Sequence, residues 1–93
     1  MVYLDYIGKV VRHYKGNYYY IEDICMDSET KEYTIIYKNL YNRKDSNVWA
    51  RPAKLFFEKI DPNKDGNITN QNYRFELVSD LTKDYTKKDI NER

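Results

Sequence analysis

Several basic and aromatic side chains lie inside segments that otherwise have the pattern of β-strands, where solubility alone does not require a charge. Arginine grips a phosphate or carboxylate with a planar fork of donors, and tryptophan and tyrosine offer flat surfaces on which a ring can stack. Brought onto one surface, such residues predict a site for a small anionic or nucleotide-like ligand. The residues we assign to this site are Arg12, His13, Tyr14, Glu29, Tyr37, Trp49, Arg51 and Arg74.

A purely structural explanation of the same residues stays open. The chain has a single tryptophan, Trp49, and a lone tryptophan in a small domain more often belongs to the core than to a site. In that case Arg51 would pair with Glu29 or Glu58 and hold loops in place.

The sequence favours a binding module over an enzyme. His13 is the only histidine and Cys25 the only cysteine, and no nucleophile motif surrounds either residue. Cys25 lies mid-strand among apolar neighbours, where we expect a buried and inert thiol. One histidine without suitably spaced cysteine or carboxylate partners does not make a typical zinc site. We therefore expect no catalytic residue, no metal and no cofactor.

The stretch from Asp61 to Thr69 begins like a calcium-binding EF-hand loop, with the pattern D-x-N-x-D-G-x-I. The twelfth position should supply a bidentate glutamate, but Asn72 occupies it and brings no charge. EF-hands also usually work in pairs, and only one such loop is present. We therefore interpret this segment as a turn with Gly66 at its tip and do not expect it to bind calcium.

Charge and composition narrow the classes of partner. Sixteen basic and fifteen acidic residues give a net charge of +1, so the basic excess that duplex-DNA binders use against phosphates is missing. One cysteine allows no intrachain disulfide. The first residues show no signal-peptide pattern, and no apolar run approaches the ~20 residues of a membrane helix. We expect a cytoplasmic protein that binds neither duplex DNA nor membranes.

Tyrosine supplies eleven of the 93 residues, and its ring with a wet hydroxyl suits the half-buried surface of a sheet. Period-2 patterns and turn signals predict strands over residues 9–14, 18–25, 33–37, 48–51 and 73–78. Residues 53–60 fit a helix that begins near Pro52 and a single helical turn that enters a strand equally well. The prediction is a mainly β domain over residues 1–78, either a small SH3-like barrel or a curled antiparallel sheet. A polar C-terminal extension, residues 79–93, would form a short helix or fray.

An ordered series of short motifs runs through this predicted domain. Arg-His-Tyr-Lys-Gly at residues 12–16 is followed by Ser-Glu-Thr at 28–30, Trp-Ala-Arg-Pro at 49–52 and Arg-Phe at 74–75. Over roughly residues 8–78 the chain resembles a bacterial domain family of unknown function. The turn before Arg74 is longer than in that pattern, and the tail after Val78 is an addition. The resemblance implies a compact β domain and no particular activity.

Two further functions remain as alternatives to a small anionic ligand. A tyrosine-rich surface suits a protein partner, so the chain could be a protein-interaction module such as a phage-encoded inhibitor of a host defence system. Small barrels also stack the bases of single-stranded nucleic acids on aromatic side chains. Exposed strand edges would in addition allow a homodimer. The lysines of the tail alternate with acidic residues, which indicates a solvated face rather than a nucleic-acid arm.

Overall fold

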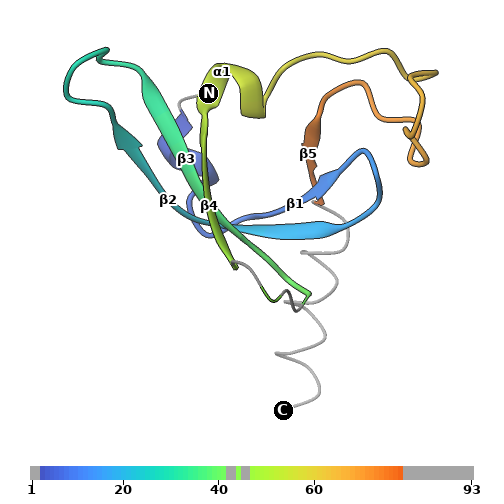
Figure 1. Cartoon of the computed structure of the whole chain (residues 1–93), viewed down its shortest axis with the longest axis horizontal. Coiled ribbons are helices and arrows are strands. Elements are labelled where there is room, and N and C mark those ends of the chain that lie inside the picture. The colour runs from blue at the N-terminus through green and yellow to red at the C-terminus, as the bar shows by residue number, and fades with distance from the viewer. Residues whose placement is uncertain (1–2, 42–43, 45–46, 79–93) are drawn as a thin grey trace.

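Five antiparallel strands form one sheet in the order β4-β3-β2-β1-β5 (Figure 1). The computed structural model describes residues 3–41, 44 and 47–78, so the predicted C-terminal extension lies outside the described residues. No described helix has the length and apolarity needed to cross a membrane. The elements in chain order are a 3-10 helix η1 (Tyr3–Tyr6), β1 (Val10–His13), β2 (Tyr18–Met26), β3 (Tyr33–Asn39), β4 (Val48–Pro52), α1 (Ala53–Phe56) and β5 (Phe75–Leu77).

The predicted mainly β class and the five predicted strands are confirmed, with shifted boundaries. β2 is one continuous strand of nine residues, and a register shift between Ile21 and Asp23 marks a bulge within it. β4 includes Pro52 as its last residue, where a missing N–H does the least harm to a ladder. The ambiguous segment after Pro52 begins with the single helical turn of α1.

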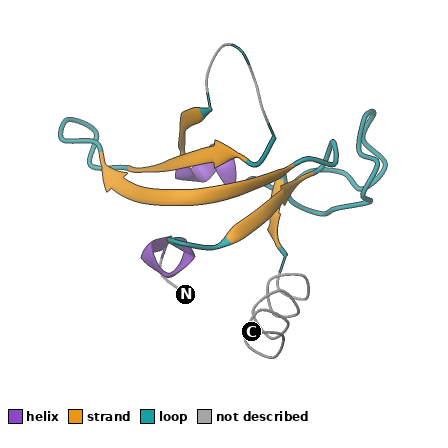
Figure 2. Cartoon of the chain, turned by 90° about the horizontal axis from the view of Figure 1, so that it is seen from below, coloured by secondary structure: helices purple, strands orange, loops and turns teal. Residues whose placement is uncertain are grey.

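The predicted SH3-like barrel is wrong, because the sheet does not close. Among the described strands, β4 pairs only with β3 and β5 only with β1, so the two edge strands do not meet. β4 and β5 lie at opposite ends of the strand order, and the bulge in β2 bends the sheet between them without bringing its edges together. The result is the curled antiparallel sheet that was the other prediction. Figure 2 shows it as one bent sheet with loops at its ends.

The core lies on the concave face of this sheet. The rings of Phe56 from α1 and Phe75 from β5 stack with centroids 4.0 Å apart, and the ring of Tyr37 meets both edge-on. Val11 and Ile35 are fully buried beside them. Ring-on-ring contact of this kind lets a short β5 dock on the sheet with few backbone hydrogen bonds.

The long segment between α1 and β5 is held by scattered backbone hydrogen bonds and by side chains rather than by a continuous ladder. Its only strand-like contact among the described residues is an isolated bridge between Lys59 and Tyr73. The buried Gln71 donates from Nε2 to the carbonyl oxygens of Arg12, at 2.9 Å, and of Tyr73, at 3.2 Å. Gly66 sits in the predicted turn with φ +84°, a conformation that favours glycine.

Candidate functional site on the concave face

Neighbouring residues of β1 point to opposite faces of the sheet, and this separates Arg12 from His13, although both belong to the predicted site. His13 pairs with the buried Phe75 and shares the concave face with the core. Arg12 points to the outer face, where its guanidinium carbon lies 5.0 Å from the centre of the Tyr18 ring. Its Nε also donates to the carbonyl oxygen of Gly16 at 3.0 Å. Arg12 is therefore not among the predicted site residues on or beside the concave face. Those residues, called here the concave-face group, are His13, Tyr14, Tyr37, Trp49, Arg51 and Arg74.

His13 is a neutral hydrogen-bond acceptor packed among rings. Its ring stacks on Tyr14 at 4.3 Å and meets Phe75 edge-on at 4.9 Å, and Nδ1 accepts a hydrogen bond from the backbone N–H of Lys15. Burial lowers the pKa of His13 from 6.5 to about 4, with further lowering from the positive charges of Arg74, Lys15 and Arg51. His13 therefore carries no charge near pH 7, and its surroundings are electropositive.

Arg74 is neutralised within the group. Its Nε donates to Glu58 Oε1 at 2.6 Å, and its Nη2 forms an ion pair with the same oxygen. The guanidinium also lies over the ring of the buried Tyr14, 5.7 Å from its centre. Arg74 therefore joins the segment after α1 to the end of β1 and already has a carboxylate.

Trp49 and Arg51 share the concave face at the other side of the sheet. They pair with the buried Tyr37 and Ile35 of β3, and both are half-buried. Trp49 Nε1 donates to the side-chain oxygen of the buried Asn39 at 2.8 Å, which fixes the indole. Trp49 thus packs against the core and is only partly exposed.

Arg51 has a buried polar atom without a partner. Its Nε is shielded from solvent and makes no hydrogen bond within the described part of the chain. Of the two carboxylates considered from the sequence, Glu58 binds Arg74 instead. Burying an arginine donor without an acceptor is costly, so this atom is a position where an incoming anion would gain most.

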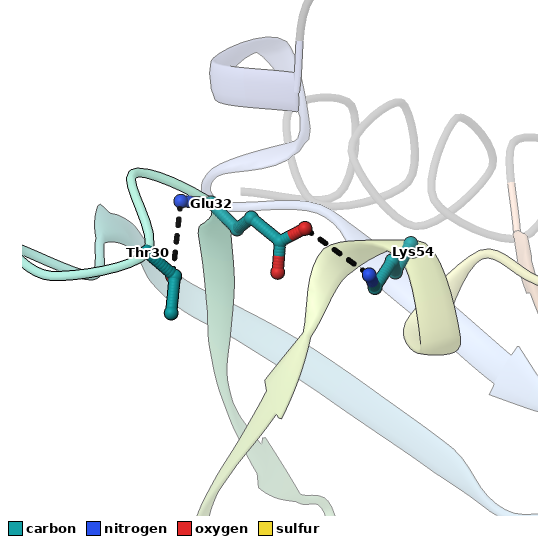
Figure 3. Close-up of polar contacts among 3 residues, drawn as sticks. All are labelled: Thr30, Glu32 and Lys54. Atoms are coloured by element: carbon teal, nitrogen blue, oxygen red, sulfur yellow. Dashed lines mark hydrogen bonds and ion pairs between the residues drawn. The ribbon is translucent and has the colours of Figure 1, made fainter.

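Glu29 lies away from the concave-face group. It is exposed in the turn after β2, where its backbone N–H donates to Asp27 Oδ1 at 2.8 Å. The adjoining residues tie this turn to α1, because Glu32 binds Lys54 Nζ at 3.1 Å and donates its own N–H to Thr30 (Figure 3). Glu29 is therefore a residue of this turn and not of the predicted site.

Six of the eight predicted site residues therefore lie on or beside the concave face, all except Arg12 and Glu29. Ring contacts join His13, Tyr14 and Arg74, whereas Trp49 and Arg51 lie across the sheet on β4. The structure adds three that we did not assign: Asn39, which holds Trp49; Glu58, which holds Arg74; and Tyr19, whose ring lies 6.3 Å from His13. Asn39 ends a strand of alternating apolar residues, and a polar residue on the buried face is the signal that could have found it.

Cys25 and the loop that resembles an EF-hand are the two features to which the sequence analysis assigned no chemistry. Cys25 is exposed, so our expectation of a buried thiol was wrong; β2 turns that side chain away from Ile24, which is buried. No group of three or more His, Cys, Asp or Glu side chains among the described residues is arranged to hold a metal. In the loop that resembles an EF-hand, Asp61 Oδ1 accepts the N–H of Asn63, and Asn67 Oδ1 accepts that of Gln71.

Comparison with known proteins places this arrangement in a family. A family model described as "Protein of unknown function (DUF1653)" matches residues 9–77. The chain belongs to this family. A crystal structure of a DUF1653 protein from Bordetella bronchiseptica is similar, with a TM-score of 0.63 and 28% identity over 80% of this chain and 88% of that one. No curated protein matches the chain. The predicted resemblance to a bacterial family of unknown function is thereby confirmed, and the DUF1653 description names no activity.

Proposed function

We propose that the concave face binds a small anionic ligand with a flat ring, such as a nucleotide, and performs no chemistry on it. The observation that carries the proposal is the buried Nε of Arg51, which has no hydrogen-bond partner in the described part of the chain. Because this atom is shielded from solvent, a small turn of the half-buried side chain is needed to bring Nε to the surface, where a phosphate or carboxylate oxygen would supply the missing acceptor and offset the charge.

The electrostatics of the group support an anion. Arg51, Arg74 and Lys15 all act on His13 in the same direction, so three cations converge on one half-buried region. Only Arg74 among them has a carboxylate partner in the described structure. A site with surplus positive charge and reduced solvent access favours an anion over a neutral ligand.

The flat ring would lie against Trp49. Residues two apart on a strand point to the same face, so the indole and the Arg51 side chain lie side by side. The hydrogen bond to Asn39 holds the indole in one orientation before any ligand arrives, which reduces the entropic cost of binding.

The chain offers a matched pair of arginines for the test. Native mass spectrometry of gently purified protein first shows whether a small mass is retained. Adenosine monophosphate, adenosine and inorganic phosphate are then titrated against the wild type, Arg51→Met and Arg12→Met, followed by NMR. We expect the nucleotide to bind best, and Arg51→Met to weaken it about tenfold or more, since a hydrogen bond to a charged group contributes roughly 1.5–3 kcal/mol.

Arg12→Met should leave binding unchanged, because Arg12 lies on the outer face over Tyr18. Equal losses in the two variants would show a general charge effect and count against a defined site. If none of the three probes shifts any signal of the concave-face residues, the proposal fails.

A protein partner is the second candidate, and the open sheet favours it. β4 is an edge strand in the described part of the chain, and an extended segment of another protein could add to it as a further strand. A partner recovered in stoichiometric amount from host lysate, and lost when a proline replaces Ala50, would support this function. Recovery that does not depend on β4 would contradict it.

A further inference from the structure

Four aromatic side chains line a hollow that is separate from the concave-face group. Tyr3 and Tyr6 come from η1, Phe57 from the end of α1, and Tyr73 from the segment before β5. The hollow encloses about 210 Å³. The rings of Tyr3 and Phe57 are stacked at 5.6 Å, and those of Tyr6 and Phe57 are tilted by 45° at 4.6 Å. Tyr3 and Tyr73 are 36% and 45% exposed, so this aromatic hollow opens to solvent.

The aromatic hollow differs from the other tyrosine surfaces of the molecule. On the outer face, Arg12 lies 5.0 Å from the centre of the Tyr18 ring and Lys38 lies 5.6 Å from that of Tyr20. Those rings already hold a cation of the chain itself. Among the described residues, no lysine or arginine lies over a ring of the aromatic hollow.

We propose that the aromatic hollow binds a quaternary ammonium group. Aromatic faces carry partial negative charge, and several rings around one cavity attract a cation whose methyl groups make it easy to desolvate. The volume is below the ~300–1,000 Å³ of pockets for drug-sized ligands, which suits a single trimethylammonium head. Asp5, between Tyr3 and Tyr6 in η1, adds a negative charge on the same short helix. Lys59 pairs with Tyr73 in the isolated bridge but does not line the hollow.

The test separates charge from shape. Choline and its neutral isostere, in which carbon replaces the nitrogen, are titrated against the full chain, with the tyrosine ring signals followed by NMR. We expect choline to bind more tightly by roughly 2- to 30-fold, the range of a cation–π contact from exposed to desolvated. Equal affinity for the neutral isostere would show a merely apolar hollow and overturn the proposal, as would the absence of any shift with choline.

Variants locate the site. Tyr73→Leu removes one wall and should weaken choline binding, whereas Tyr73→Phe keeps the ring and should retain it. Tyr20→Leu, on the outer face, is the control that should leave binding unchanged. If Tyr20→Leu weakens choline binding as much as Tyr73→Leu does, the hollow is not the site.

A trimethylammonium group can belong to a free solute or to a methylated lysine. Choline is therefore compared with a short peptide carrying trimethyl-lysine and with the same peptide carrying unmodified lysine. Tighter binding of choline would support the site with a free solute as ligand. Tighter binding of the methylated peptide alone would support it with a modified protein as ligand, and equal binding of the two peptides would overturn the requirement for a quaternary group.

Discussion

Replacing Arg51 with methionine should make the folded chain more stable. Methionine keeps the length of the apolar stem but removes the guanidinium, whose Nε is buried without a partner among the described residues. An unsatisfied buried donor destabilises the folded state by about 1–3 kcal/mol, and the substitution removes this penalty. It also removes the packing of the guanidinium plane, which cancels part of the gain in stability. We expect the free energy of unfolding to rise by about 1 kcal/mol, which for a domain of this size raises Tm by about 4–8 °C.

The same variant should change a second observable in a fixed direction. Arg51 is one of the cations that lower the pKa of His13, after burial and the charges of Arg74 and Lys15. Without Arg51, the pKa of His13 should therefore rise from about 4. Because His13 is the only histidine, its ring signal in a pH titration by NMR is unambiguous.

Urea denaturation gives the stability change, with the m-value as a check that the compactness of the two states is unchanged. A destabilisation of about 1 kcal/mol or more at constant m would refute the reasoning, since it would mean that the guanidinium has a stabilising partner. An unchanged pKa of His13 would show that Arg51 does not act on the histidine. Gain of stability together with loss of anion binding is the trade-off expected of a functional arginine.

Three further changes probe the framework of the site, each by urea denaturation. Lowering the pH from 6.5 to about 4 should destabilise the folded chain, because folding lowers the pKa of His13 and the unfolded chain therefore takes up the proton first. After discounting for solvent screening, we expect the free energy of unfolding to fall by about 1–2 kcal/mol. His13→Gln should lack this loss. Phe56→Ala should cost about 3–5 kcal/mol, because Phe56 is fully buried and stacked on Phe75; a cost under about 1 kcal/mol would contradict this packing. Gly16→Ala should cost about 1–2 kcal/mol, because Gly16 has φ +114° and its added Cβ would lie 2.8 Å from Ile68 Cδ1; an unchanged midpoint would show that the turn adapts freely.

The strands could be predicted from the sequence because their side chains alternate. In β3 the burial of Ile35 and Tyr37 follows the predicted period of two, and β4 ends at Pro52, one residue beyond the predicted strand. Closure could not be predicted in this way, because it depends on the lengths of the two edge strands and on a bulge in β2 that no turn residue marks. The sequence of a short strand such as Phe75–Leu77 has the same alternating pattern in a barrel and in an open sheet.

The grouping of site residues was predicted only in part. Adjacent positions such as Arg12 and His13 cannot share a face of a strand, and the period of two was sufficient to separate them. The approach of Arg74 to Glu58 depends on the path of the long segment between α1 and β5, which local patterns do not specify. The same holds for the aromatic hollow, whose rings come from three separate parts of the described chain.

The buried amide of Gln71 has a consequence for how this domain can vary. Its side chain joins the long segment to β1 across a sequence separation of 59 residues, and the backbone N–H of Ile68 adds a hydrogen bond to the carbonyl oxygen of Tyr14. Among the described residues, the exposed stretch around Asp65 makes no such bond to β1. Residues could be inserted or deleted near Asp65 at small entropic cost as long as the amide remains in place. The tip of this segment is therefore a suitable place to carry an inserted tag, while an apolar replacement of Gln71 would leave the carbonyl oxygens of Arg12 and Tyr73 without this donor.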